Sequence, residues 1–594
     1  MGLAAALVAM CGWALRRGFD ITDEGFHLLN YAYPAEYSSS FSSFHLLISQ
    51  VLPAQQVSVV GYRAASLLMA LFSASVFSWA FRRWSAARFG AALPVAWVWP
   101  LFIICSLVQY AVFPRTINYN TLNSLAIAIF GSAVLNYLAA PGRRALALLG
   151  LGGLVMGLDG FVKLSSSAAA LGSGALVLVL SAPGGFGRPA ARHSLLVLGA
   201  GALLAIGGFG LFVKPLPAWY HDFHHETEVL LSTSYNSGLL ARYVRDAFPT
   251  IQTLLFPFGA VAAVAGAWVY YRGRGLNRLG QHLAVVAGVA LVLGLEGYRT
   301  GLYKNTHFNG HRSASWPLGC LLVGAAMLVA ARQRYVGPLW LRGNWRPWLV
   351  PLWLLVLPLA AAVGTGNNIF INVQLEEMYW LAALLVLYQS LPAPVQPLRA
   401  VRLALVALPA LVLAEQTAYG LLWKPYLQVE NMFQQQTPLT VGPPPHPTRL
   451  LVDAPSARYL QALRAALHRA GFRPGGPLLA LYDAPGLVYA VGGVSPGNAW
   501  YFSGIDTRNS DALAKTHLDL GRAFLLVNEK PGAGLFASLA ARGLHFPADY
   551  QLVHQAISPY SRSPYQWRSQ QDTLQVYAPR PRAGSFRAPP TPVD

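Results

Sequence analysis

The sequence predicts a polytopic α-helical membrane protein with about 13 transmembrane helices and a C-terminal soluble α/β domain on the extracytoplasmic side. Three observations predict this fold class. Of the 594 residues 55% are hydrophobic and only 11% are charged, with a mean hydropathy of +0.42, which lies outside the range of soluble globular proteins. Many apolar runs approach the roughly 20 residues that cross a bilayer. Beyond about residue 430 the composition changes to that of a soluble domain.

The apolar runs define the expected membrane domain, residues 1–425. We expect its helices at residues 2–15, 58–80, 90–112, 117–139, 144–161, 164–181, 195–213, 249–271, 280–298, 314–331, 347–364, 377–391 and 402–423. Residues 144–161 and 164–181 follow each other without a loop, so we expect a sharp corner between them.

The charges of the connecting loops predict the orientation. Alternate loops carry arginines and no Asp or Glu, for example Arg82, Arg83 and Arg88. By the positive-inside rule these loops face the cytoplasm, so the N-terminus is cytoplasmic. The opposite, extracytoplasmic loops are expected at residues 16–57, 214–248, 299–313 and 365–376. The net charge of +20 is explained in this way, and we expect no nucleic-acid partner.

The C-terminal region is expected outside the membrane. Residues 426–448 are rich in proline and predict a linker, and residues 449–580 predict the α/β domain. Within that domain "ARYLQALRAALHRAGF" has helical spacing, whereas "GPLLALYD" and "RAFLLVNE" are typical of buried strands. Residues 581–594 predict a disordered tail.

The first extracytoplasmic loop contains three carboxylates, Asp20, Asp23 and Glu24, directly after the first apolar run. Apolar residues then recur at helical spacing up to Val51, which predicts an amphipathic helix on the membrane surface. Acids held between such a helix and the bilayer would meet a lipid-borne substrate. A solvated acidic loop is the alternative. Arg63, inside the second span, is costly there unless it pairs or reaches the membrane interface with its charged end. We expect it to pair with these acids.

Further polar residues lie near the extracytoplasmic ends of other spans. Asp159 and Lys163 are four residues apart at the expected corner, so they either pair with each other or leave Lys163 to hold a phosphate. Arg299 and Lys304 make an outer loop cationic, against the positive-inside trend, which indicates an anionic ligand such as a lipid phosphate. The alternative is that they balance the acidic first loop.

These features together resemble the GT-C glycosyltransferases, and most closely the branch of protein O-mannosyltransferases and aminoarabinose transferases. The likeness rests on the "DE" of the first outer loop, the helix after it, the "GL…K" corner, the span count and the outer C-terminal domain. The resemblance covers roughly residues 1–425. It implies transfer of a sugar from a polyprenyl-phosphate carrier to a protein, lipid or glycan acceptor at the outer face.

The resemblance also implies roles for individual residues. The catalytic acid would be Asp23, with Glu24 beside it, and the donor phosphate would be held by Lys163 and by Arg299 or Lys304. In the second outer loop, "FPRTINYNTLN", asparagines stand where the family often has another acid. We count Asn120 of that loop, with His27 and Arg63, among the candidate substrate-binding residues.

Two other functions stay open on the sequence alone. A lipid or glycan transporter would also need charges in the membrane, and an inactive GT-C-like assembly subunit would keep the fold without the reaction. The sequence requires no cofactor and no metal site, and it leaves open a divalent cation. We expect an integral protein of a bacterial inner membrane, in contact with its lipids.

Overall fold

The computed structural model of the chain describes most of its residues. The described ranges are 1–37, 42–53, 56–182, 189–231, 239–271, 310–335, 346–364, 368–391, 399–444, 446–503, 506–528, 532–562 and 573–580. The expected span 280–298 and the expected tail 581–594 lie outside them.

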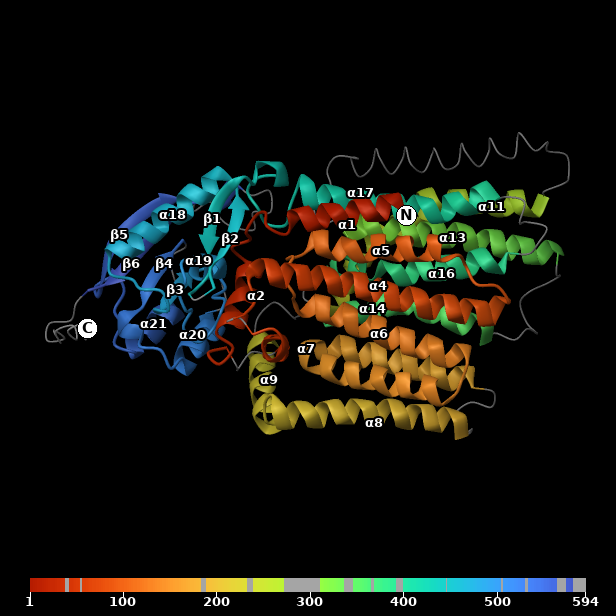
Figure 1. Cartoon of the computed structure of the whole chain (residues 1–594), viewed down its shortest axis with the longest axis horizontal. Coiled ribbons are helices and arrows are strands. Elements are labelled where there is room, and N and C mark those ends of the chain that lie inside the picture. The colour runs from red at the N-terminus through yellow and green to blue at the C-terminus, as the bar shows by residue number, and fades with distance from the viewer. Residues whose placement is uncertain are drawn as a thin grey trace.

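A bundle of long helices forms most of the molecule, and the α/β domain lies at one end of it (Figure 1). The bundle and its loops contain α1 (Gly2–Ala14), α2 (Asp23–Ala32), α3 (Phe44–Val51), α4 (Val59–Phe89), α5 (Val95–Val112), α6 (Tyr119–Ala139), α7 (Arg143–Ser181), α8 (Pro189–Phe212), α9 (Leu216–Leu231), α10 (Leu239–Thr253), η2 (Leu254–Phe258), α11 (Gly259–Tyr271), α13 (Gly310–Tyr335), η3 (Arg346–Trp348), α14 (Leu349–Ala362), α15 (Ile369–Val373), η4 (Gln374–Glu376), α16 (Glu377–Ser390) and α17 (Arg399–Leu422).

Within the described ranges, eight helical segments are long and apolar enough to cross a membrane. They are α4 to α8, the greater part of α13, the run Ile369–Ser390, and Leu405–Leu422 of α17; the shorter apolar helices are α1, α11 and α14. Large apolar side chains on the outside of the bundle are exposed, for example Leu203 and Leu204 of α8 at 69% and 70%. Such a surface is suited to lipid, and the protein is membrane-embedded.

Helix α7 is a hairpin of two helices. The backbone leaves helical geometry at Lys163, with φ −151° and ψ 76°. The Ser167 hydroxyl of the second half donates to the Met156 carbonyl of the first half at 2.6 Å, so the two halves lie side by side. The sharp corner that the sequence predicted between residues 144–161 and 164–181 is confirmed.

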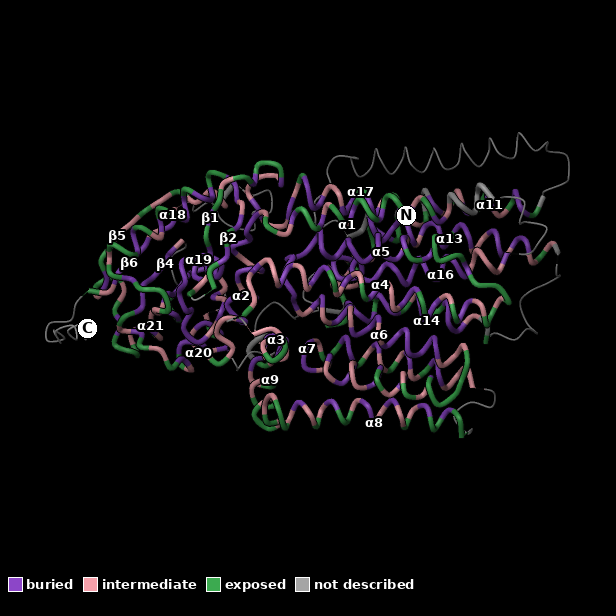
Figure 2. Tube along the Cα trace, viewed as in Figure 1, coloured by how far each residue is buried: buried purple, intermediate pink, exposed green. Residues whose placement is uncertain are grey.

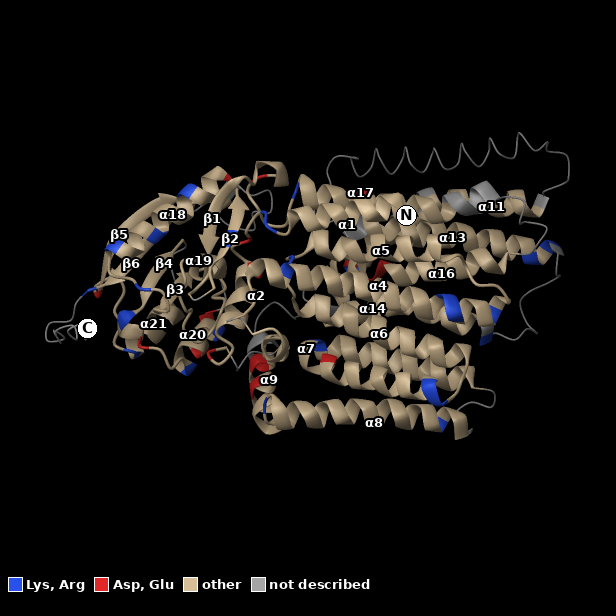
Figure 3. Ribbon diagram, viewed as in Figure 1, with Lys and Arg blue, Asp and Glu red and all other residues tan. Residues whose placement is uncertain are grey.

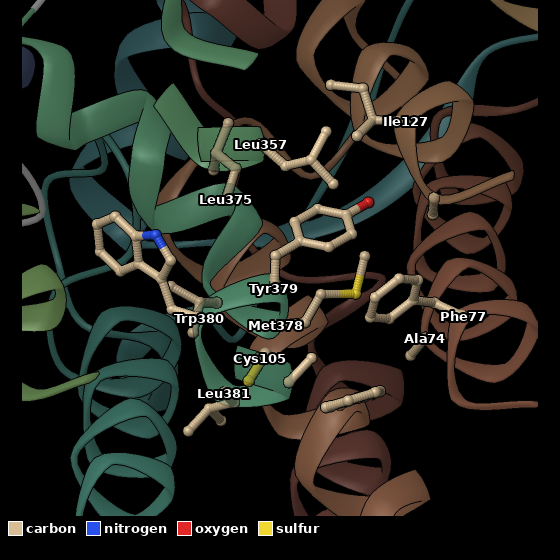
Figure 4. Close-up of a cluster of buried hydrophobic side chains, with 14 of the residues drawn as sticks. Ala74, Phe77, Cys105, Ile127, Leu357, Leu375, Met378, Tyr379, Trp380 and Leu381 are labelled. Carbon is tan, nitrogen blue, oxygen red and sulfur yellow. The ribbon is translucent and has the colours of Figure 1, made fainter. Parts of the chain in front are cut away.

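Buried residues run along the interior of the bundle (Figure 2), and a large cluster of them is apolar. Figure 4 shows one such region, where Tyr379 of α16 lies between Phe77 of α4, Ile127 of α6 and Leu357 of α14. The rings of Phe77 and Tyr379 meet edge to face with centroids 4.8 Å apart. Packing of this kind fixes the helix ends from which the polar residues of the site project.

Lysine and arginine are concentrated at the end of the bundle that lies away from the C-terminal domain (Figure 3). Arginines at this end lie at the ends of long helices. Arg88 is in the last turn of α4, and Arg143 is the first residue of α7. The domain end of the bundle instead holds the acidic first loop.

The C-terminal domain is built around two small sheets. β1 (Thr437–Val441) and β2 (Thr448–Val452) form an antiparallel pair, and β3 (Leu478–Leu481), β4 (Phe524–Val527), β6 (Thr573–Pro579) and β5 (Tyr550–Ile557) form a sheet in that order. β3 and β4 are parallel, and the other neighbours are antiparallel. The helices and 3-10 turns of this part are η6 (Met432–Gln434), α18 (Ala454–Arg469), α19 (Pro485–Ala490), α20 (Asp506–Lys515), η7 (Leu520–Arg522), α21 (Ala533–Ala541) and η8 (Pro559–Arg562). The predicted helix and both predicted strands are confirmed as α18, β3 and β4.

The domain is fastened to the loop that follows α1, and to α2, by backbone contacts. Gly18 N–H donates to Leu451 O and Leu451 N–H donates to Arg16 O, both at 2.7 Å. Gly486 of α19 donates to Ile21 O at 2.7 Å and lies directly against Gly25 of α2. A side chain at either glycine would overlap backbone, so glycine is required for this approach.

Three expectations need correction. The expected linker 426–448 contains β1, because its alternating Leu439 and Val441 bury against the domain. The expected loop 365–376 forms α15 and η4 where it is described, because apolar residues such as Phe370 and Val373 pack into the bundle. The expected span 249–271 is not one regular helix, since Pro249 and Pro257 fall where α10, η2 and α11 succeed one another.

Candidate active site

The acidic turn before α2 is held by its own side chains. Asp20 Oδ1 accepts bonds from the amide and hydroxyl of Thr22 at 2.8 and 2.7 Å, and Asp20 Oδ2 accepts from Glu24 N–H at 2.9 Å. Asp20 thus satisfies a free amide of the first turn of the helix. Burial, and then the neighbouring Asp23, raises the pKa of Asp20 to about 8. Asp20 is therefore a structural carboxyl that is largely protonated at neutral pH.

Glu24 forms a two-pronged ion pair with Arg63 of α4. Arg63 Nε donates to Glu24 Oε1 at 2.8 Å and Arg63 Nη2 donates to Oε2 at 2.6 Å. Its other donors reach the carbonyls of Leu15, Arg17 and Gly18, so all five N–H groups of this buried guanidinium are used. Burial opposes ionisation of Glu24, but Arg63 lowers its pKa below the usual value.

The expected pairing of Arg63 with the acidic loop is confirmed by this geometry. The pair fastens the end of α1 to α4 and leaves no donor of Arg63 for a ligand. Both residues are therefore assigned to the scaffold of the site and not to its ligand contacts.

Of the three acids, Asp23 alone has neither an ion pair nor several hydrogen bonds to its own turn. It begins α2 and is only partly buried. Its side chain accepts one hydrogen bond, at 2.6 Å, from the hydroxyl of Tyr426, which follows α17. Burial raises the pKa of Asp23, and the bond from Tyr426 partly offsets this. A carboxylate with a raised pKa is a stronger base than an ordinary aspartate, and with few internal bonds it is suited to accept a proton from a substrate.

A small cavity adjoins this acid. Its cavity volume is about 10 Å³, and the wider hollow around it, which includes open solvent, measures about 260 Å³. Its lining consists of Asp20 and Glu24 from the acidic turn, Ala111, Phe113, Pro114 and Arg115 from the end of α5, and Gly420, Leu421, Pro425, Tyr426 and Gln428 from the end of α17. Asp23 is joined to it through Tyr426.

His27 lies one turn along α2 from Asp23 in an aromatic cluster. Its ring centroid is 5.2 Å from that of Phe44 and 6.0 Å from that of Tyr119. His27 Nδ1 is buried without a hydrogen-bond partner. Burial, and then His45, lowers the pKa of His27 to about 3, so its imidazole is neutral. The cluster connects α2 with the start of α6, where the next candidates lie.

Lys163 and Asn120 meet at the corner of α7. Lys163 Nζ donates to the Ala361 carbonyl at 2.8 Å and lies 3.4 Å from Asn120 Oδ1. Asp159 accepts instead from Asn123 Nδ2 at 2.7 Å, and its Oδ1 is buried without a partner. No ion pair joins Asp159 to Lys163 within the described residues. Hydrogen bonds from the corner thus run to α6 and α14 and not between Asp159 and Lys163.

The remaining candidates give less information. Arg299 and Lys304 lie outside the described residues. Away from the acidic turn, His225 of α9 contacts Asp511 of α20 at 2.9 Å. Within the described ranges no group of three His, Cys, Asp or Glu side chains is arranged to hold a metal ion.

Sequence reasoning missed Arg115, Tyr426 and Gln428. Arg115 is an arginine at a helix end that we expected on the extracytoplasmic side, against the positive-inside trend, and that signal would have found it. Tyr426 and Gln428 stand in the segment that we interpreted as a linker, and nothing in their local pattern indicates a site.

No protein-family model, curated protein or solved structure matches this chain. Its function is therefore inferred from its own residues and their geometry.

Proposed function

We propose that the protein is a GT-C-type membrane glycosyltransferase that moves a sugar from a polyprenyl-phosphate carrier to an acceptor hydroxyl at the outer face of the membrane. The observation that carries the proposal is the state of Asp23. It is the one carboxylate of the acidic turn left available, and it lies beside a cavity at the end of the helical bundle. A lipid-linked substrate would be presented at this level of the bilayer.

The proposal includes the topology of the chain. Thirteen or so crossings with a cytoplasmic N-terminus place the C-terminal domain outside, in a bacterial inner membrane. The arginines at the opposite end of the bundle support this orientation, because that end would be cytoplasmic (Figure 3). Membrane lipids surround the apolar outer surface.

The proposed reaction assigns Asp23 as general base. The acceptor hydroxyl gives its proton to the Asp23 carboxylate while its oxygen bonds to the anomeric carbon of the donor. The bond from that carbon to the phosphate oxygen breaks, and polyprenyl phosphate leaves with the electron pair. Asp23 then returns the proton to solvent. Tyr426 orients the carboxylate through its 2.6 Å hydrogen bond. The acceptor is a protein, lipid or glycan.

The test compares wild type with Asp23→Asn. The purified full chain in lipid nanodiscs is incubated with a pool of polyprenyl-phosphate sugars and a membrane extract as acceptor, and released polyprenyl phosphate is measured. Asparagine keeps an acceptor for Tyr426 but is no base, so we expect release to fall by about 10²–10⁴-fold.

Asp519→Asn is the matched control, because Asp519 is an exposed aspartate of the C-terminal domain, and it should release at the wild-type rate. Equal activity of Asp23→Asn and wild type would show that Asp23 is not the general base. Absence of release from every donor would reject the transferase, and movement of intact donor across the membrane would then identify a transporter.

A further inference from the structure

The guanidinium of Arg115 is the one buried cation beside the cavity whose donors are not all used within the described residues. Arg115 is 6% exposed and lies in the turn between α5 and α6. Its Nη1 donates to Ala14 O and its Nη2 to Arg17 O, at the end of α1. A guanidinium has five N–H donors, so three remain without an acceptor in the described part of the chain.

No carboxylate is paired with Arg115 in the described residues. The negative charge of Glu24 attracts Arg115, but both carboxylate oxygens of Glu24 are hydrogen-bonded to Arg63. Asp20 also lines the cavity, but both its oxygens accept bonds within the acidic turn, and it is largely protonated at neutral pH. Burial, and then repulsion by Arg63, lowers the pKa of Arg115 to about 10, so Arg115 stays charged at pH 7.

Gln428, another residue of the cavity wall, provides a second, independent observation. Its side chain is 5% exposed, lines the cavity, and its Oε1 is buried without a partner. The two ends of an amide differ only in the assignment of nitrogen and oxygen, so Gln428 can present its NH₂ donors to the cavity. A buried polar side chain without a partner calls for a ligand or water.

We propose that Arg115 and Gln428 bind an oxyanion of the phosphate class in this cavity. An arginine edge with free donors matches a tetrahedral oxyanion, and the amide supplies a further donor. The inference rests on the proposed function, because it names Arg115, and not Lys163, as the group that holds the donor phosphate. Lys163 donates to Ala361 and Asn120 and is not among the residues that line this cavity.

The position of this anion site suits the proposed reaction. Tyr426 lines the same cavity and donates to Asp23, so one side chain connects the anion site with the base. A phosphate bound by Arg115 would have its developing negative charge stabilised as the sugar departs. The phosphate could belong to a lipid carrier or be free, and the two sources are separated by choice of probe.

The test measures binding to the purified full chain in detergent by titration calorimetry with farnesyl phosphate, farnesol and inorganic phosphate. We expect farnesyl phosphate to bind at least about tenfold more tightly than farnesol, which lacks the anion. Comparable binding of inorganic phosphate would show that the site takes the free ion, whereas preference for farnesyl phosphate would show a lipid source. Equal binding of farnesol and farnesyl phosphate would overturn the proposal.

Gln428→Glu is the decisive variant, because it keeps the shape of the side chain and adds a negative charge to the cavity. It should weaken farnesyl phosphate binding by about tenfold or more and leave farnesol unchanged. Gln434→Glu is the control, since Gln434 is an exposed glutamine of the same segment, and should bind like wild type. An unchanged affinity in Gln428→Glu would overturn the proposal.

Arg115→Lys is a second test variant. It keeps the positive charge but lacks the planar guanidinium with its paired donors, so it should also weaken farnesyl phosphate binding. Its caps on α1 are lost with it, so its folding is checked by circular dichroism. The outcomes for the two proposals are separable. If anion binding depends on Gln428 but no sugar is transferred, the anion site is kept and the transferase is rejected. If sugar transfer occurs and Gln428→Glu does not affect it, the transferase is kept and the anion site is rejected.

Discussion

Replacing Arg63 by leucine should destabilise the protein strongly. The Arg63 and Glu24 side chains are 0% and 2% exposed, and the guanidinium also satisfies the carbonyls of Leu15, Arg17 and Gly18. Removing one partner of a buried ion pair typically costs about 3–5 kcal/mol, because the other charge stays buried and unpaired. We expect a loss in this range for Arg63→Leu.

The assay is a double-mutant cycle. The free energy of unfolding is measured for wild type, Arg63→Leu, Glu24→Leu and the double variant by detergent-induced unfolding in mixed micelles, followed by circular dichroism. The double variant should be less destabilised than the sum of the two single variants, by about 1–3 kcal/mol. Arg522→Leu is the control, because its pair with Asp519 is exposed at 85% and 69%, and it should cost less than about 1 kcal/mol.

The reasoning would be refuted by two results. One is a loss for Arg63→Leu no larger than that of the surface control. The other is strict additivity in the cycle, which would mean that the two side chains do not interact.

Two further predictions concern pH and packing at the same loop. The folded pKa of His27, about 3, lies below its unfolded value of about 6.5, so its contribution to stability is lost as pH falls through this interval, at up to about 1.4 kcal/mol per unit. His27→Phe keeps an aromatic ring without a titrating group, so in thermal unfolding it should lose less stability than wild type between pH 6.5 and 5. If the stabilities of the two proteins fell equally with pH, the lowered pKa of His27 would be contradicted. Gly25→Ala should lower thermal stability and increase protease cleavage between bundle and domain, because the added methyl carbon would lie 2.1 Å from Gly486 Cα. Gly172→Ala has open space and should be neutral or stabilising, so equal effects of the two would disprove the close contact.

Features that depend on local pattern were predictable from the sequence. The long apolar runs identified the membrane helices that the structure describes, because only such runs can satisfy the backbone in lipid. The apolar runs 144–161 and 164–181 follow each other without a loop, which predicted the corner at Lys163. Short apolar stretches predicted β3 and β4. The position of the acidic turn directly after α1 was also evident.

The roles within that turn were decided only by the tertiary structure. Asp20, Asp23 and Glu24 are chemically alike and lie within five positions, so their sequence cannot rank them. They differ in partners that lie far away in the chain. Glu24 is taken by Arg63, 39 residues on, whereas Asp23 receives its one bond from Tyr426, 403 residues on.

The same reason explains the residues that were missed or misplaced. Whether Arg115 has spare donors depends on which carbonyls α1 brings to it, and whether residues 426–448 are a free linker depends on whether β2 lies beside them. By itself the sequence determined that this is a membrane-embedded protein with acids at the end of its first helix. The folded chain decided which acid and which cation remain available, because hydrogen-bond satisfaction in a buried site is a property of contacts between distant segments.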